Sequence, residues 1–175
     1  MILDNAAWYS LNGPHRRFAQ RVELAARYER DVAPFGAIPD VASPEAWSAL
    51  ADLVGPGNVA LLFRAEVDPP PDWKIEFSVP GVQMVADSYE GEPAPDAVEL
   101  GAADVADMLD LVGRTRPGPF LPRTFELGRY IGIRDGDRLV AMAGERLRCD
   151  GLTELSAICT DADYRGRGLA TTLVS

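Results

Sequence analysis

Residues 138–170 are the most informative part of the chain for its topology, and they read RLVAMAGERLRCDGLTELSAICTDADYRGRGLA. The first part of this stretch predicts β-strands over Arg138 to Cys149 and over Leu152 to Thr160, because an Asp-Gly pair between β-prone runs favours the tight turn of an antiparallel hairpin. Its end predicts a glycine-rich turn at 165–170, from which a helix begins near Leu169. This order of elements indicates an α/β (α+β) protein with an antiparallel sheet in this region.

The glycine turn, Arg165-Gly166-Arg167-Gly168-Leu169-Ala170, has the composition of an anion-binding site. Glycines allow backbone N–H groups to face outward, and the start of a helix adds a partial positive charge. A diphosphate fits such a turn, because neighbouring N–H donors can bind several oxygens at once and two arginines add charge. In the alternative interpretation the glycines only serve a tight strand-to-helix turn and the arginines are solvated. The turn by itself leaves both interpretations open.

These residues resemble the GNAT superfamily of acyl-coenzyme A-dependent N-acetyltransferases, whose signature is Arg/Gln-x-x-Gly-x-Gly/Ala. Arg165, Gly168 and Ala170 fill the signature. Residues 153–164 look like the strand and loop that precede this turn in the family, and residues 138–146 look like the strand before them.

The resemblance extends over residues 98–175, and it implies a mixed, mostly antiparallel central sheet flanked by helices. Two shorter stretches, 11–15 and 54–57, look like the extra amino-terminal region of a two-part GNAT subgroup. We therefore expect an amino-terminal α/β region at 1–90 and an N-acetyltransferase domain at 97–175. The polar stretch 87–96 is the expected connection between them.

The resemblance implies transfer of an acetyl group from acetyl-CoA, the acyl donor, directly to an amine in a ternary complex. The acceptor would be a small molecule or a peptide amino group, and no metal would take part. Backbone N–H groups of the glycine turn would hold the pyrophosphate, and the backbone of the preceding strand would pair with the pantetheine arm and polarise the thioester carbonyl. The coenzyme-binding residues expected on this basis are Ile158, Cys159, Thr160, Arg165, Gly166, Arg167, Gly168, Leu169 and Ala170.

GNAT domains continue past this helix through another strand, a helix and a last strand, which complete the coenzyme cleft and often supply a tyrosine acid. The sequence stops at Ser175, so the resemblance implies a domain that is incomplete at its carboxyl end. The alternative function is a non-catalytic acyl-CoA-binding or regulatory module that lacks this half of the active site.

Glu154 and Glu145 are the candidate catalytic bases, since an ammonium acceptor must lose a proton before it can attack. If Asp150-Gly151 is a two-residue turn, the two glutamates are diagonal neighbours on one face of the hairpin. Partial burial and a like charge would then raise the pKa of one of them. Alternatively, these glutamates pair with Arg146, Arg148 or Arg129, or face solvent.

The composition excludes several other functions. The chain has 175 residues and a formal net charge of −10, which opposes binding to nucleic acid. No apolar run approaches the ~20 residues of a membrane helix, and the first residues do not resemble a secretory signal, so we expect a cytoplasmic protein. Lys74 is the only lysine, which excludes a P-loop, and His15 is the only histidine, which argues against a histidine-based metal site or catalytic triad. A Rossmann fingerprint fails at Thr171, where a third glycine is required.

The amino-terminal half predicts helices followed by strands. The apolar spacing predicts an amphipathic helix over 15–29 and a second helix after the Ser43-Pro44 cap, while 58–65, 73–79 and 81–86 are β-prone runs. In the carboxyl-terminal half we expect a helix that ends at Gly113 and a strand that starts at Phe125. Phe120, in the proline-rich loop between them, is either a wall of the acceptor site or a packed core residue.

Overall fold

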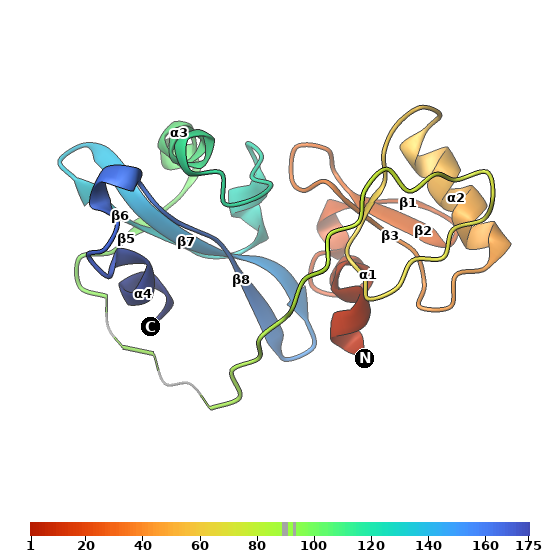
Figure 1. Cartoon of the computed structure of the whole chain (residues 1–175), viewed down its shortest axis with the longest axis horizontal. Helices are drawn as coiled ribbons and strands as arrows, with labels where there is room; N and C mark the ends of the chain where they lie inside the picture. Colours follow the sequence, from red (N-terminus) through yellow and green to blue (C-terminus); the bar gives the residue numbers. More distant parts are fainter. Residues whose placement is uncertain (89–90, 93) are drawn as a thin grey trace. The chain divides into compact units, whose positions relative to one another are not determined.

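The computed structural model describes residues 1–88, 91, 92 and 94–175, and the chain forms two compact units (Figure 1). The first unit contains Met1–Glu29, Pro34–Ser88 and the short segment Arg148–Gly151. The second contains the rest of the chain, including Arg30–Ala33.

The first unit is built on a four-stranded sheet in the order β1-β2-β3-β4. Strands β1 (Ala19–Val22), β2 (Ala25–Tyr28) and β3 (Phe35–Ala37) are antiparallel neighbours, and β4 (Leu61–Leu62) runs parallel to β3. Ala25 packs against helix α2 (Pro44–Val54), whereas the Tyr28 hydroxyl bonds to Ser10 of α1 (Ala6–Asn12). Side chains three apart on a strand point to opposite faces, so the two helices cover opposite faces of this sheet.

Helix α2 (Pro44–Val54) confirms the predicted cap. The Ser43 hydroxyl accepts a hydrogen bond from the Ala46 N–H at 3.3 Å, and Pro44 occupies the first turn, where no N–H partner is needed. The helix ends at Gly55, whose φ of +82° favours glycine.

The predicted helix over 15–29 is wrong, because this segment forms the hairpin of β1 and β2. Val22 pairs with Ala25 across a turn, which places two residues three apart on the same face. The hairpin thus reproduces, over a short span, the spacing that a helix also gives. The β-prone runs at 73–79 and 81–86 belong to neither sheet among the described residues, since strand propensity without a pairing neighbour does not form a ladder.

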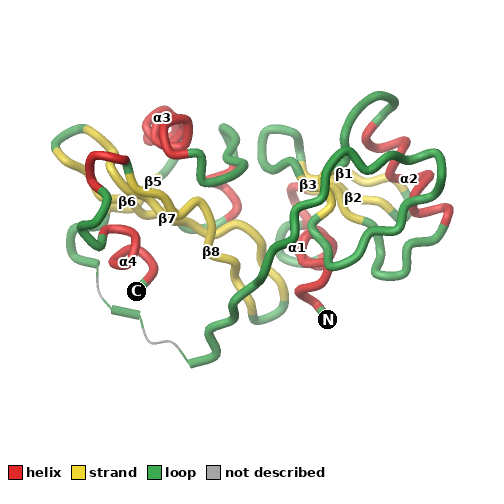
Figure 2. Tube along the Cα trace, viewed as in Figure 1, coloured by secondary structure: helices red, strands yellow, loops and turns green. Residues whose placement is uncertain are grey.

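The second unit contains an antiparallel sheet in the order β5-β6-β7-β8 (Figure 2). Its strands are β5 (Val98–Leu100), β6 (Tyr130–Asp135), β7 (Arg138–Cys149) and β8 (Leu152–Thr160). The bounds of β7 and β8 confirm the two predicted hairpin strands. The mixed, mostly antiparallel architecture with flanking helices confirms the predicted fold class.

The strand expected from Phe125 is wrong in its first part, where the 3₁₀ helix η4 (Thr124–Leu127) forms instead. The Thr124 hydroxyl donates to the carbonyl of Val32 at 2.7 Å and accepts from the N–H of Leu121 at 2.8 Å. Such side-chain bonds to the backbone compete with a strand ladder.

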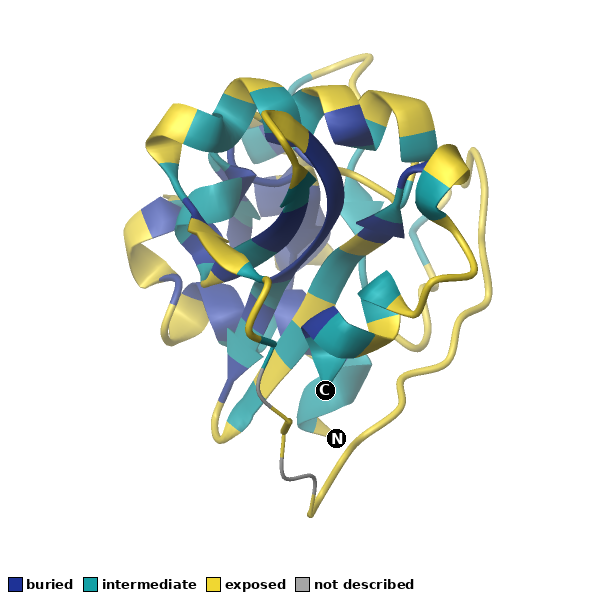
Figure 3. Cartoon of the chain, turned by 90° about the vertical axis from the view of Figure 1, so that its left-hand side faces the viewer, coloured by how far each residue is buried: buried dark blue, intermediate teal, exposed yellow. Residues whose placement is uncertain are grey.

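Two helices cover opposite faces of the second sheet, and the buried residues lie between these layers (Figure 3). Helix α3 (Val105–Thr115) runs past Gly113, where we expected its end, and ends before Arg116, which has a left-handed φ of +52°. Its Met108 and Leu111 pack with Met142 and Tyr130. Helix α4 (Leu169–Val174) packs Leu173 against Ile133 and Ala141 on the other face. None of the described helices is long and apolar enough to cross a membrane.

Candidate functional site

The glycine turn connects the end of β8 to the start of α4, and it is exposed from Arg165 to Gly168. Gly166 and Gly168 have φ values of +76° and +78°, which side chains rarely adopt, and a Cβ on either would meet no atom within 4 Å. Within the described residues, none of the N–H groups from Gly166 to Ala170 donates to a protein oxygen. The turn therefore presents consecutive unpaired backbone donors at a helix start, as an anion site requires.

Both arginines of the turn are held beside it. The Arg165 Nε donates to the Thr160 carbonyl at 3.4 Å. Arg167 donates to the Asp163 carbonyl at 3.1 Å, and its guanidinium carbon lies 4.7 Å from the centre of the Tyr164 ring. Their positive charges therefore remain near the unpaired N–H groups, although both residues are exposed.

Asp161 fixes the junction between β8 and the turn, and it was not among the predicted site residues. It is 3% exposed, and its carboxylate accepts hydrogen bonds from Arg138 at 2.7 Å and from the Asp163 N–H at 3.1 Å, and also pairs with Arg114. Its own N–H donates to the Val140 carbonyl at 2.8 Å. The Asp-x-Asp pattern could have indicated a cap, but the arginines come from α3 and β7 and give no local signal.

The regular backbone of β8 is interrupted just before Ile158, the first of the residues expected to pair with the pantetheine arm. Ala157 has a φ of +53°, and beyond it the alternation of exposed and shielded residues shifts by one, as at a β-bulge. Ile158 is 40% exposed, whereas Cys159 is buried, which raises the pKa of its thiol. Strand β8 is last in the sheet order, so its outer edge faces no strand among the described residues.

The two candidate bases are turned toward different neighbours. Glu154 forms a bidentate ion pair with Arg146 of β7, with oxygen to nitrogen distances of 2.6 and 2.8 Å. Glu145 accepts a hydrogen bond at 3.0 Å from the backbone N–H of Arg129, just before β6. Glu154 therefore has the arginine pairing that the alternative interpretation gave for it, whereas the bond of Glu145 is to the backbone of Arg129 and not to its guanidinium.

Phe120 packs as a core residue. It is 7% exposed, and its ring meets the Tyr130 ring edge to face with centroids 5.5 Å apart. His15 is 3% exposed and has its Nδ1 3.0 Å from the hydroxyls of Ser10 and Tyr28, in the first unit. The part of the chain that the structure describes contains no cluster of His, Cys, Asp and Glu suited to a metal ion.

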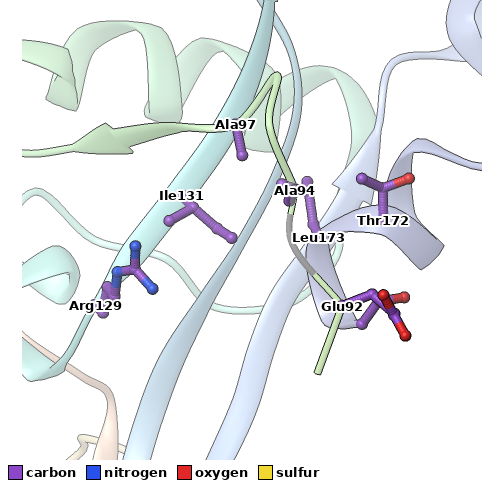
Figure 4. Close-up of a pocket in the computed structure, with 8 residues that line it drawn as sticks. Glu92, Ala94, Ala97, Arg129, Ile131, Thr172 and Leu173 are labelled. Carbon is purple, nitrogen blue, oxygen red and sulfur yellow. The ribbon is translucent and has the colours of Figure 1, made fainter. Parts of the chain in front are cut away.

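A pocket of about 300 Å³ lies on the α4 side of the second sheet (Figure 4). Ala97, Ile131 and Leu173 give it apolar walls, and Arg129 and Glu92 lie at its margin. None of the residues that line it is among the predicted site residues.

The second unit thus has an antiparallel sheet whose last strand leads through a glycine turn with unpaired N–H groups into a helix. A family model described as FR47-like protein matches residues 130–175. The chain is also similar to a crystal structure from Novosphingobium aromaticivorans DSM 12444, assigned to the GNAT family as an acetyltransferase. The two share 34% identity and a TM-score of 0.83 over 99% of this chain and 78% of that one.

The chain therefore belongs to the GNAT family, which confirms the resemblance seen in the sequence. A second structure, the ribosomal-protein-S18-alanine N-acetyltransferase of Escherichia coli, is 22% identical, with a TM-score of 0.38 over 45% of this chain and 53% of that one. The comparison with curated proteins gave no match.

Proposed function

We propose that this protein is an N-acetyltransferase that transfers an acetyl group from acetyl-CoA to an amine. The observation that carries the proposal is the row of unpaired N–H groups from Gly166 to Ala170. Membership of the GNAT family supports acetyl transfer in general. The donor, the amine acceptor and the assignment of the activity to residues 97–175 are part of the proposal.

In this proposal acetyl-CoA supplies the activated acetyl thioester, and the chain's own backbone holds it. The N–H groups of the glycine turn bind the pyrophosphate, with Arg165 and Arg167 adding positive charge. The outer edge of β8 at Ile158, Cys159 and Thr160 pairs with the pantetheine arm. Asp161 keeps these two parts in register, because it ties the end of the strand to α3 and β7.

The acceptor amine must lose a proton before it attacks, and we assign that step to Glu154, with Glu145 as the second candidate. The Glu154 side chain is 29% exposed, so an amine can reach it from solvent. To accept the proton, its carboxylate has to share or give up a hydrogen bond from Arg146. The net charge of −10 favours the approach of a cationic acceptor.

A non-catalytic acyl-CoA-binding module is the second candidate. It is favoured by the fact that both candidate bases already hold hydrogen bonds, Glu154 from Arg146 and Glu145 from the Arg129 backbone. Such a module would keep the glycine turn and bind the coenzyme without turnover.

The test is an assay for free thiol released from acetyl-CoA in the presence of a panel of primary amines, with coenzyme binding measured in parallel. Amine-dependent thiol release, weakened by Glu154→Gln more at neutral pH than at high pH, supports the enzyme. Binding without turnover supports the module, and absence of both contradicts the proposed function.

A further inference from the structure

The segment 73–86 of the first unit exposes many apolar side chains to solvent. All of its residues are described, and they form neither a helix nor a strand (Figure 2). In the part of the chain that the structure describes, the backbone of 74–86 makes no hydrogen bond to other backbone groups. The large apolar side chains that are half or more exposed here are Ile75, Phe77, Val79, Val82, Met84 and Val85. An exposed apolar segment whose backbone groups lack partners is a template for pairing with another chain.

Both ends of this segment are fixed to the first unit. The Trp73 ring packs against the Trp47 ring of α2, with centroids 5.4 Å apart. The Gln83 side chain donates a hydrogen bond to the Leu3 carbonyl at 2.9 Å. The exposed residues between these two anchors are therefore presented from a defined place on the first unit.

The first part of the segment has the side-chain arrangement of a strand. Its sequence alternates apolar and polar residues from Trp73 to Phe77. The Lys74 ammonium lies 3.1 Å from a carboxylate oxygen of Glu76, and both side chains are exposed. Side chains two apart lie on the same face when the chain is extended. The charged residues thus share one face, and the apolar residues are expected on the other.

This order of residues is complementary to itself in an antiparallel pair of two copies. A pair centred on Ile75 places Lys74 of each copy opposite Glu76 of the other. The same register places Trp73 of each copy opposite Phe77 of the other. Opposite charges and aromatic rings are cross-strand neighbours that stabilise a sheet. A register centred on Lys74 or on Glu76 would instead bring like charges together.

The backbone bonds that are already present allow this register. The Trp73 N–H donates to the Pro70 carbonyl at 3.0 Å, so it is not available to a ladder. Hydrogen-bonded and non-hydrogen-bonded pairs alternate along an antiparallel ladder. Lys74 and Glu76 can therefore exchange the ladder bonds, while the apolar residues take the other positions, where side chains approach more closely. Pro80 has no N–H and ends the ladder.

We propose that this segment pairs with the same segment of a second copy, forming a two-fold symmetric dimer through an antiparallel ladder centred on Ile75. The dimer shields Ile75 and Phe77, whose side chains are exposed in the single chain. A two-fold interface requires a self-complementary surface, which this register provides. Two short strands bury a small area, so we expect a dissociation constant in the micromolar range. The inference does not depend on the proposed acetyltransferase function.

Charge exchange tests the register in sedimentation equilibrium experiments over a range of protein concentrations. Lys74→Glu and Glu76→Lys each replace both attractive pairs with like charges, so each should raise the dissociation constant about tenfold or more. An effect of net charge alone would weaken only Lys74→Glu, since Glu76→Lys reduces the net charge of −10. An equimolar mixture of the two variants should restore the dimer, because the mixed pair again has opposite charges at both positions. This rescue also shows that both variants are folded.

Phe77→Ser and Val82→Ser separate the proposed pair from general association of exposed apolar groups. Val82 is 91% exposed, but it lies beyond Pro80 and outside the ladder. Phe77→Ser should weaken the dimer about tenfold, because it removes the aromatic pairs, whereas Val82→Ser should leave it unchanged.

Three results would each overturn the inference. The first is a wild-type chain that stays monomeric at several hundred micromolar, which would assign the segment to a different partner. The second is a mixture of the two charge variants that remains monomeric. The third is a loss in Val82→Ser as large as that in Phe77→Ser.

Discussion

Gly168 offers a direct test of the glycine turn, because its backbone conformation disfavours a side chain although its surroundings leave room for one. Its φ of +78° disfavours any side chain, yet a Cβ would meet nothing within 4 Å. Gly168→Ala therefore introduces backbone strain without a steric clash. A left-handed conformation costs a non-glycine residue about 1–2 kcal/mol. Alanine also lowers the conformational entropy of the unfolded chain, which offsets about 0.4–1 kcal/mol of that cost. We expect a net loss of about 1 kcal/mol in the free energy of unfolding.

The effect on the coenzyme should be larger than this loss. Relief of the strain rotates the backbone and redirects the N–H groups of Gly168 and Leu169 away from a bound pyrophosphate. A hydrogen bond to a charged group contributes about 1.5–3 kcal/mol, so the loss of one weakens binding about 10- to 100-fold. Calorimetric titration with coenzyme A measures this affinity, and urea unfolding measures stability.

Gly57→Ala is the matched control in the first unit. Gly57 has a φ of +75°, and its added Cβ would also meet nothing within 4 Å. It should lose about the same stability as Gly168→Ala, by the same backbone argument, while coenzyme binding stays unchanged. If both variants bind coenzyme A as the wild type does, the turn does not hold the pyrophosphate and the reasoning fails.

Three further predictions concern side chains of the second unit. Asp161→Asn should lower the free energy of unfolding by about 3 kcal/mol, because it leaves two arginines without their buried partner. Asp110→Asn, which removes an exposed partner of Arg114, should lower the free energy of unfolding by less than about 0.5 kcal/mol in the same urea experiment. Equal losses in the two variants would refute the view that Asp161 holds the end of β8 in place. Hydrogen bonds from the Gly101 N–H and from Arg134 lower the pKa of Asp104, so its stabilisation is present above about pH 4 and is lost as the pH falls below its ordinary pKa. Between pH 3 and pH 7 the free energy of unfolding measured in urea should therefore depend less on pH in Asp104→Asn than in the wild type. The same pH dependence in both proteins would count against this. Ile158→Val should leave coenzyme binding within about twofold, because the proposed contact is made by the backbone, and a tenfold loss would indicate a side-chain contact instead.

The elements that sequence could predict are those with local signals. The Asp-Gly turn and its β-prone flanks gave β7 and β8 with their observed bounds, and Ser43-Pro44 gave the start of α2. The hairpin of β1 and β2 was missed because pairing across its turn mimics helical spacing.

The candidate site likewise combines residues that have a local sequence signal with residues that have none. The glycine turn could be recognised because its residues are consecutive. The partners of Asp161 and the ion pair of Glu154 with Arg146 depend on strand register and on distant elements, which short-range patterns do not specify.

The central claim is that the backbone of the glycine turn receives the diphosphate of coenzyme A. Calorimetric titration of coenzyme A into the wild-type chain tests it, with pantetheine, which lacks the diphosphate and the adenosine, as the comparison ligand. We expect saturable binding of coenzyme A that is much tighter than that of pantetheine. Equal affinity for the two ligands, or no binding of coenzyme A, would contradict it.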